Sequence, residues 1–451
     1  MLRRVAPSVT LGAAAMRSCV ACAALLFGTT LSAQSTPPLL SDADRILGLS
    51  QLWQEVNRSF VFKDRLGFSV DSLYLATLPK VIAAKDLYDY YRELQRFTGA
   101  LRDGHTGVSF PNALSNERTY PWLTTRWIDG HLMINNSGKS LAKAFPFGTE
   151  ITTIDGRPAR EYLEAEVLPF TTSSTDHFRW AWGAREALYG RASKPVRIQY
   201  ERPDGTRGDT TLARDRRTRD DAWLSPTEQP RFAWKWLSDS IAYVALRSFA
   251  DNGIKDDFAA IIPTLRRARG LVIDVRGNTG GNSGNGWDIL AHMVKDSLPL
   301  QVWRTRIHNA AYKGWGRSGF ANDSAFTPFD SGNVYPPYAD PLLVPTVILQ
   351  DNETFSAAED FLVAADEIPR ILTMGQVSGG STGNPIFWQL PGGGFARVVS
   401  KHDRYRDGRE FVGRGVRPRA TLAPPTLADV RAGRDPVLTA AVAAVKRQSP
   451  T

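Results

Sequence analysis

Cysteine is almost absent from this chain, which has two among 451 residues, Cys19 and Cys22. Both lie in the first 33 residues, which read as a leader, so a mature chain without them has no disulfide, no thiol nucleophile and no thiolate metal ligand. His-Glu-x-x-His and acidic calcium loops are missing too, and we expect no metal and no cofactor. The lack of Gly-x-Ser-x-Gly argues against an α/β-hydrolase elbow.

Long apolar runs are also lacking beyond the N-terminus. Arg3, Arg4 and Arg17 precede or flank a small, apolar stretch over residues 20–31, and Leu31-Ser32-Ala33 resembles a cleavage site. This pattern predicts a signal peptide over residues 1–33 and an exported protein, periplasmic or secreted, without stable membrane insertion after cleavage. The stretch is too short to span a bilayer comfortably.

No part of the sequence has a concentration of charges of one sign. The formal net charge of +9 falls to +6 once the three leader arginines are removed. Acids and bases alternate, without a basic stripe interleaved with aromatics, so we do not expect a nucleic acid partner.

The hydrophobic pattern divides the rest of the chain into modules. After a linker over 34–40, residues 41–112 show helical periodicity, with helices expected near 41–60 and 87–101. Residues 113–228 read as short strands and turns, including a hairpin around Pro203-Asp204-Gly205. Residues 229–446 alternate strands and helices, so the fold class we expect is α/β. Strands are expected at 241–246, 271–275 and 347–349, and helices at 256–267, 287–294 and 357–368.

Ser356 stands where the apolar strand 347–349 gives way to a helix. A serine there lies at the positive end of the helix dipole, beside N–H groups with no partner inside the helix. That environment favours an alkoxide, so Ser356 is a candidate nucleophile. Ser356 and Glu359 also form the Ser-x-x-Glu pattern of a capping box, which needs no chemistry.

A glycine loop, Arg276-Gly277-Asn278-Thr279-Gly280-Gly281, follows the strand 271–275. A structural turn is one interpretation, and a phosphate loop is disfavoured because no lysine follows Gly281. The catalytic interpretation is an oxyanion hole made by the N–H groups of Gly280 and Ala357.

Six histidines are present, and His105 is the candidate base because it follows a helix end at Asp103-Gly104 and precedes a strand expected at 106–110. The other five histidines, which have no local catalytic signature, are His131, His177, His292, His308 and His402. A hydrogen-bonded structural histidine is the alternative for His105.

These segments, in this order, resemble the tail-specific and tricorn-like serine peptidases of peptidase family S41. Residues 101–106 are similar to the family's "L-x-D-x-H-T" motif, and residues 147–158 to its PDZ-like turn. Residues 271–281 are similar to its "L-V-I-D-L-R-x-N-x-G-G" motif, and residues 352–359 to its "N-x-x-T-x-S-A-A-E" motif. Residues 413–419 are similar to its "G-x-G-V-x-P-D" motif. Two departures stand out: Gly104 replaces a serine found in tricorn-type sites, and Arg419 replaces the usual aspartate.

The resemblance implies a ClpP/crotonase-like spiral core, a PDZ-like β domain and an N-terminal helical domain. One branch of the family uses a lysine as base, and that position falls on Ser381 here, so His105 and the histidine branch are implied. Glu410 is the implied carboxylate behind the histidine, with Asp103 as its competitor. Gly281 and Ser381 are further candidates for support.

We therefore expect an exported serine peptidase that cleaves proteins or peptides, near their C-termini, by a Ser356-His105-Glu410 mechanism. Its activity should fall below the free histidine pKa of about 6.5. The alternative is an inactive relative that binds peptides or a hydrophobic ligand. Oligomerisation is left open.

Overall fold

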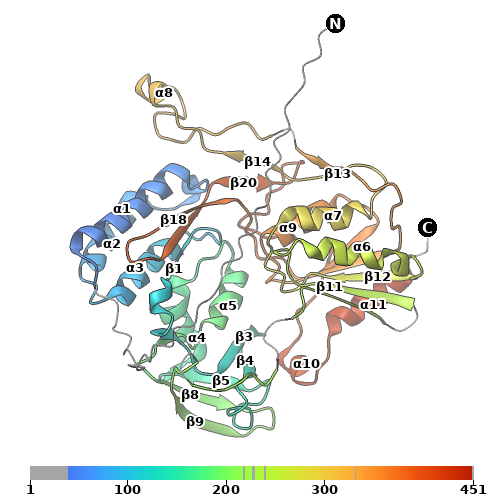
Figure 1. The fold of residues 1–451 in the computed structure, drawn as a ribbon, viewed down its shortest axis with the longest axis horizontal. Helices are drawn as coiled ribbons and strands as arrows, with labels where there is room; N and C mark the ends of the chain where they lie inside the picture. The colour runs from blue at the N-terminus through green and yellow to red at the C-terminus, as the bar shows by residue number, and fades with distance from the viewer. Residues whose placement is uncertain (1–38, 217–218, 226–228, 238–239, 331, 449–451) are drawn as a thin grey trace, which may run out of the picture. The chain divides into compact units, whose positions relative to one another are not determined.

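The computed structural model describes residues 39–216, 219–225, 229–237, 240–330 and 332–448 (Figure 1). The predicted signal peptide therefore lies outside the described residues. Within them, no helix is both long and apolar enough to cross a membrane. The described residues belong to one compact unit, and the expected module boundaries remain predictions.

Three helices open the described chain: α1 (Asp42–Ser59), α2 (Val70–Ile82) and α3 (Leu87–Ala100). Each begins at a residue whose side chain accepts a backbone N–H, namely Ser41, Ser69 and Asp86. Their apolar faces are buried in the main core. The helical N-terminal region is confirmed, although α2 had not been expected.

An antiparallel sheet follows, in the order β3-β4-β5-β8-β9, with β6 on β5. Its strands are β3 (Leu123–Ile128), β4 (His131–Ser137), β5 (Glu150–Ile154), β6 (Arg157–Pro158), β8 (Val196–Glu201) and β9 (Arg207–Leu212). It has a core of its own and carries α4 (Ala159–Tyr162) and α5 (Asp176–Arg185). The expected hairpin is β8–β9. The helices had not been expected, because the sequence reasoning followed only the strand and turn signals here.

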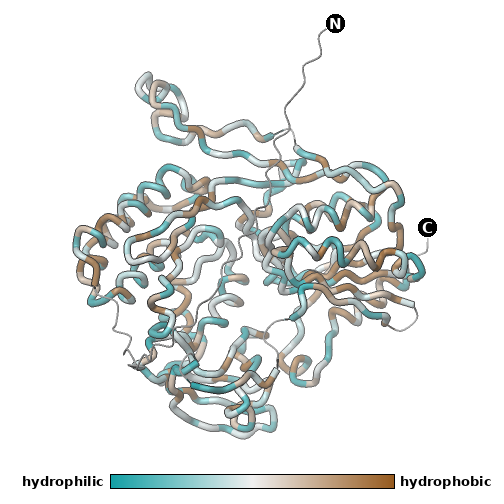
Figure 2. The backbone as a smooth tube through the Cα atoms, viewed as in Figure 1, coloured by the Kyte–Doolittle hydropathy of each residue, from teal (hydrophilic) through white to brown (hydrophobic). Residues whose placement is uncertain are grey.

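The second large sheet has the order β10-β11-β12-β16-β17-β21, and only β10 runs antiparallel to its neighbour. Its strands are β10 (Phe232–Trp236), β11 (Ile241–Leu246), β12 (Gly270–Asp274), β16 (Thr346–Gln350), β17 (Ile371–Gly375) and β21 (Ala420–Thr421). Apolar residues fill β11 and β12, which are largely brown in Figure 2. Strands buried on both faces need helices on both sides.

Those helices are α6 (Gly253–Leu265), α7 (Ser283–Ala291) and α9 (Ala357–Asp366), whose buried side chains share a core with Ile273 and Ile348. On the other face α11 (Pro436–Arg447) packs with Val272 and Val347. The expected α/β alternation is confirmed. Because β12 and β16 are parallel neighbours, the glycine loop and the Ser356 segment leave the sheet at the same edge.

A three-stranded sheet joins segments that are far apart in the sequence. β1 (Gly107–Ser109) pairs with β19 (Phe395–Val399), which pairs with β18 (Pro385–Gln389). β14 (Val302–Thr305) pairs with β20 (Lys401–Arg404). The remaining strands and α-helices are β2 (Arg118–Thr119), β7 (Gly190–Arg191), β13 (Leu298–Pro299), α8 (Ala310–Gly314), β15 (Val334–Tyr335) and α10 (Leu427–Arg431).

Candidate active site

Ser356 is the residue that directly precedes α9, and its backbone is strained. Its φ of 59° and ψ of −128° lie outside the regions that ordinary residues prefer. The strained turn is held by the Ser356 N–H, which donates to the carbonyl of Ser381 (3.0 Å) and to Oε2 of Glu359 (3.2 Å). Strain that surrounding bonds maintain is typical of functional sites.

The histidine predicted as base meets this serine. Nε2 of His105 lies 2.9 Å from Oγ of Ser356, and Nδ1 lies 2.8 Å from Oγ of Ser381. For Nε2 to accept the Ser356 proton, Nδ1 must carry its hydrogen and donate it to Ser381. The imidazole is stacked on Phe355, with ring centroids 4.9 Å apart and planes 4° from parallel, so its plane is fixed as well.

The turn before β1 holds His105 in place. The His105 N–H donates to Oδ1 of Asp103 (2.9 Å), and Ser174 donates to the other carboxylate oxygen (3.3 Å). A Cβ on Gly104 would lie 2.7 Å from Cζ of Phe355. The ring that stacks on His105 therefore occupies the space that a serine at position 104 would need, which accounts for this departure from the family pattern.

Burial keeps the imidazole neutral. His105 is 5% exposed, and burial, reinforced by the positive charges of Arg397 and Lys401, lowers its pKa to about 3. A neutral imidazole is the form that a general base needs. The predicted loss of activity below pH 6.5 rested on a solvent-exposed histidine, and the buried environment of His105 removes that premise.

The glycine loop lies directly against the serine. Gly280 has φ of 98°, and a Cβ there would be 2.7 Å from Cβ of Ser356 and 2.8 Å from N of Ala357. Only glycine allows this approach. However, the Gly280 N–H already donates to Oδ1 of Asn278 (2.9 Å), so the structure gives the predicted oxyanion donor another partner.

The next amide of the loop is better placed. The Gly280 carbonyl accepts the N–H of Phe249 (2.9 Å). Since the described peptide bonds are trans, the Gly281 N–H points away from this carbonyl, in the opposite direction within the same peptide plane. Among the described residues, neither the Gly281 N–H nor the Ala357 N–H donates a hydrogen bond.

Glu359 connects the turn at Ser356 to the loop that carries Ser381. It is fully buried and accepts four hydrogen bonds: from Ser378 Oγ (2.5 Å) and Gly380 N (2.7 Å) on Oε1, and from Ser381 N (2.7 Å) and Ser356 N (3.2 Å) on Oε2. Burial raises its pKa to about 8, although all four donors act in the opposite direction. One carboxyl group thus fixes both the serine and the loop that contacts His105.

Glu410 is not brought to the imidazole. Its carboxylate accepts from Nε2 of His402 (2.8 Å) and from Arg65 (3.2 Å), while serine hydroxyls contact both ring nitrogens of His105. The competing carboxylate, Asp103, contacts the backbone of His105 and not the ring. The group next to Nδ1 is Ser381, which the sequence had offered only as a supporting candidate.

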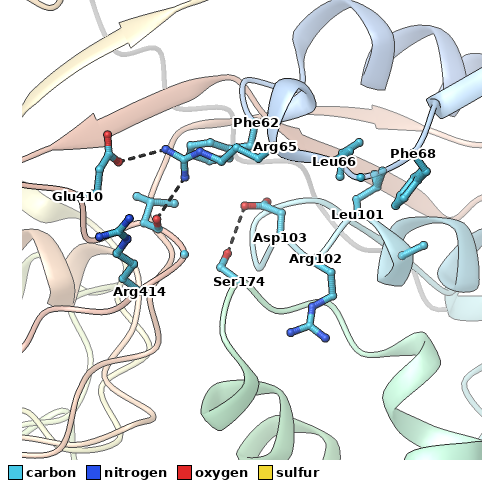
Figure 3. A pocket seen from close by; sticks show the side chains of 14 residues that line it. Phe62, Arg65, Leu66, Phe68, Leu101, Arg102, Asp103, Ser174, Glu410 and Arg414 are labelled. Carbon is cyan, nitrogen blue, oxygen red and sulfur yellow. Dashed lines mark hydrogen bonds and ion pairs between the residues drawn. The ribbon is translucent and has the colours of Figure 1, made fainter.

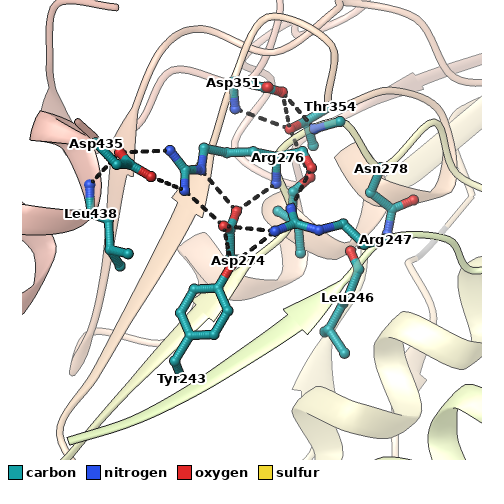
Figure 4. A network of polar contacts seen from close by, with 12 residues as sticks. Tyr243, Leu246, Arg247, Asp274, Arg276, Asn278, Asp351, Thr354, Asp435 and Leu438 are labelled. Atoms are coloured by element: carbon teal, nitrogen blue, oxygen red, sulfur yellow. Dashed lines mark hydrogen bonds and ion pairs between the residues drawn. The ribbon is translucent and has the colours of Figure 1, made fainter. Parts of the chain in front are cut away.

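A charged network anchors the start of the glycine loop (Figure 4). Asp274 is fully buried and accepts from Arg276 (2.8 Å), Arg247 (3.1 Å) and Tyr243 (2.7 Å). Burial alone would raise the pKa of Asp274, but its two arginine partners lower it to about 2. Asp435 at the start of α11 binds Arg276 as well, so the network joins the loop to the last helix.

Sequence reasoning missed two functional roles. Glu359 was noted only as a helix cap, and Phe355 was not singled out. The Ser-x-x-Glu signal was correct but incomplete, because capping patterns do not reveal what else the carboxylate binds. No cluster of three or more potential metal-binding side chains occurs in the described parts of the chain.

A strained serine that contacts a buried neutral imidazole, beside two unpaired amides at a helix N-terminus, defines a serine-type hydrolase site. Residues 240–422 match the model of Peptidase family S41. This region of the chain is therefore similar to the serine-type peptidases of peptidase family S41.

Solved structures share the fold. Mature CPAF complexed with lactacystin is 15% identical with a TM-score of 0.69, covering 90% of this chain and 98% of that one. Mature CPAF in another crystal structure has 16% sequence identity and a TM-score of 0.69, and the match covers 86% of this chain and 94% of that one. A peptidase from Parabacteroides merdae has 16% sequence identity and a TM-score of 0.54, and the match covers 91% of this chain and 99% of that one. Among curated proteins, none matches the chain.

Proposed function

We propose that the protein is a peptidase that hydrolyses peptide bonds of proteins or peptides, near their C-termini, with Ser356 as nucleophile. The observation that carries this proposal is the 2.9 Å contact between Ser356 Oγ and His105 Nε2. This contact supports our assignment of the protein to the histidine branch of the family, and no metal takes part in the proposed reaction.

In the acylation step, Oγ of Ser356 attacks the scissile carbonyl carbon while Nε2 of His105 takes the hydroxyl proton. The carbonyl oxygen becomes an oxyanion, which the N–H groups of Ala357 and Gly281 stabilise. His105 then gives its proton to the leaving amine as the C–N bond breaks, and an acyl-enzyme remains.

Deacylation repeats these steps with water. His105 removes a proton from the water, the hydroxide attacks the ester carbonyl, and Ser356 leaves with the proton returned by His105. During both steps Nδ1 carries a hydrogen that Ser381 accepts, which preserves the reactive tautomer.

The other elements of the proposal concern the surroundings of this chemistry. We assign a ClpP/crotonase-like core to residues 229–446 and a PDZ-like role to the antiparallel sheet of residues 113–228. Such a module would present an extended peptide by strand addition. The leader pattern over residues 1–33 supports export to the periplasm or medium.

Labelling with a fluorophosphonate probe tests the nucleophile. We expect the wild-type protein to be labelled and Ser356→Ala to remain unlabelled. Ser400→Ala serves as a matched control, because the Ser400 hydroxyl donates to the carbonyl of Asn384 at an exposed site. An unlabelled wild type, or equal labelling of wild type and Ser356→Ala, would favour the inactive, peptide-binding alternative.

A further inference from the structure

A cavity of about 450 Å³ lies beside the turn that carries His105 (Figure 3). It is bounded by the segment after α1, by the end of α3 and by residues 410–414. Neither Ser356 nor His105 lines it, so it is distinct from the reaction centre.

One wall of this cavity is apolar. It is formed by Phe62, Leu66, Phe68 and Leu101, and Phe68 is 42% exposed. An apolar wall open to solvent favours a ligand with an apolar part, because binding removes that surface from water.

Cationic side chains also line the cavity. Arg65 lies over the ring of Phe62 (4.4 Å) and is fixed by the Val412 carbonyl (3.3 Å), while much of its side chain stays exposed. Arg414 is exposed, and in the described part of the chain no carboxylate lies within ion-pair distance of it. In Figure 3 its side chain extends beside Glu410.

The acids of the cavity do not cancel this charge. Glu410 is already bonded to Arg65 and His402, and Asp103 is 1% exposed, where burial raises its pKa and so disfavours its negative form. Arg102 is paired with Asp176 outside the cavity lining. Arg414 therefore remains available to a carboxylate from a ligand.

The cavity connects to the catalytic residues from two sides. Asp103 on its wall accepts the backbone N–H of His105, and Gly413 on its wall donates to the carbonyl of Gly380, next to Ser381 (2.7 Å). In the proposed reaction His105 protonates the leaving amine, so the histidine side of Ser356 faces the leaving segment of the substrate.

From this geometry we infer that the cavity is a subsite for the leaving segment of the substrate, and that it holds an apolar residue together with a carboxylate bound by Arg414. The inference rests on the proposed peptidase function. The carboxylate has two sources: the terminal carboxylate of the substrate, or an aspartate or glutamate side chain near the cut.

Binding to full-length Ser356→Ala protein tests the subsite without turnover. Three dansylated decapeptides share one apolar sequence: one ends in leucine as the free acid, one in leucine amide, and one in Glu-Leu-amide. We expect the acid or the glutamate peptide to bind at least tenfold more tightly than the plain amide, which is about 1.4 kcal/mol. Tighter binding of the free-acid peptide identifies the terminal carboxylate as the ligand group, and tighter binding of the glutamate peptide identifies the side-chain carboxylate.

Adding Arg414→Ala to the same background should abolish this preference and leave binding of the plain amide unchanged. Arg417→Ala is the matched control, since Arg417 is exposed on the same segment but does not line the cavity. Equal binding of the three peptides, no binding of any of them, or the same effect of both arginine substitutions would overturn the subsite. Labelling of wild type by the fluorophosphonate probe reports separately on the peptidase function.

Discussion

Replacing Glu359 by glutamine changes the hydrogen bonds at the point where the serine and the Ser381 loop meet. Three backbone N–H groups are divided between its two oxygens: Gly380 on Oε1, and Ser381 and Ser356 on Oε2. A glutamine amide must place its NH₂ group on one side or the other. In either orientation at least one buried N–H then faces a donor in place of an acceptor.

The less costly orientation points the NH₂ group toward Ser378 and Gly380. It keeps the bonds to Ser381 and Ser356 but leaves the Gly380 N–H unsatisfied, at a cost of about 1–3 kcal/mol. If about 2 kcal/mol of this is lost from the positioning of Ser381, kcat/KM falls about thirtyfold, since each 1.36 kcal/mol is tenfold. The free energy of unfolding should fall by a similar amount.

Steady-state kinetics on a chromogenic peptide, with urea unfolding, measures both effects. Glu367→Gln, at the other end of α9, is the matched control and should change neither. The sharper readout is a double-mutant cycle with Ser381→Ala. If Glu359 acts through Ser381, the double variant should be no slower than the slower single variant. The reasoning would be refuted if the losses of kcat/KM in the two single variants multiplied in the double variant. It would also be refuted if Glu359→Gln lost stability but kept its full kcat/KM.

Other predictions follow from the same site. Because the pKa of His105 is lowered to about 3, kcat/KM for an uncharged substrate should change less than twofold between pH 7 and pH 5, where Glu359 with its pKa of about 8 stays mostly protonated, whereas a base of pKa about 6.5 would lose about 25-fold in a pH–rate profile. Gly280→Ala should abolish fluorophosphonate labelling, because its Cβ would collide with Ser356, while Gly205→Ala, also at positive φ but without neighbours, should cost about 1 kcal/mol in urea unfolding and leave labelling intact. Asp274→Asn should lower the free energy of unfolding by about 3 kcal/mol, since it leaves buried arginine charge unpaired; the stabilisation by Asp274 is present above pH 3.8 and is lost as the pH falls toward 2.

Much of the site could be predicted from local sequence because local chemistry determines it. The strand before Ser356, the helix after it and the glycines beside it each follow from patterns a few residues long. The serine-histidine contact was predicted by resemblance, and the structure brings the two residues together.

The partner of the imidazole could not be predicted in the same way. Glu410 was chosen from its place near the chain end, but pairing with Arg65 and His402 holds it elsewhere. That pairing depends on contacts between distant segments, which no local pattern encodes. Ser381 has the role because Glu359 fixes its backbone, and the sequence showed Glu359 only as a cap.

His105 is separated from β1 only by Thr106, and β1 is held by pairing with β19 near the other end of the chain. The base and the nucleophile are 251 residues apart in sequence, and the strand that secures the base lies beyond both. During synthesis the chain therefore cannot assemble its catalytic pair until residues 395–399 have been made. Long-range closure of this kind is a slow step in folding. Under the proposed mechanism, an unfinished chain therefore cannot yet cleave its neighbours or itself.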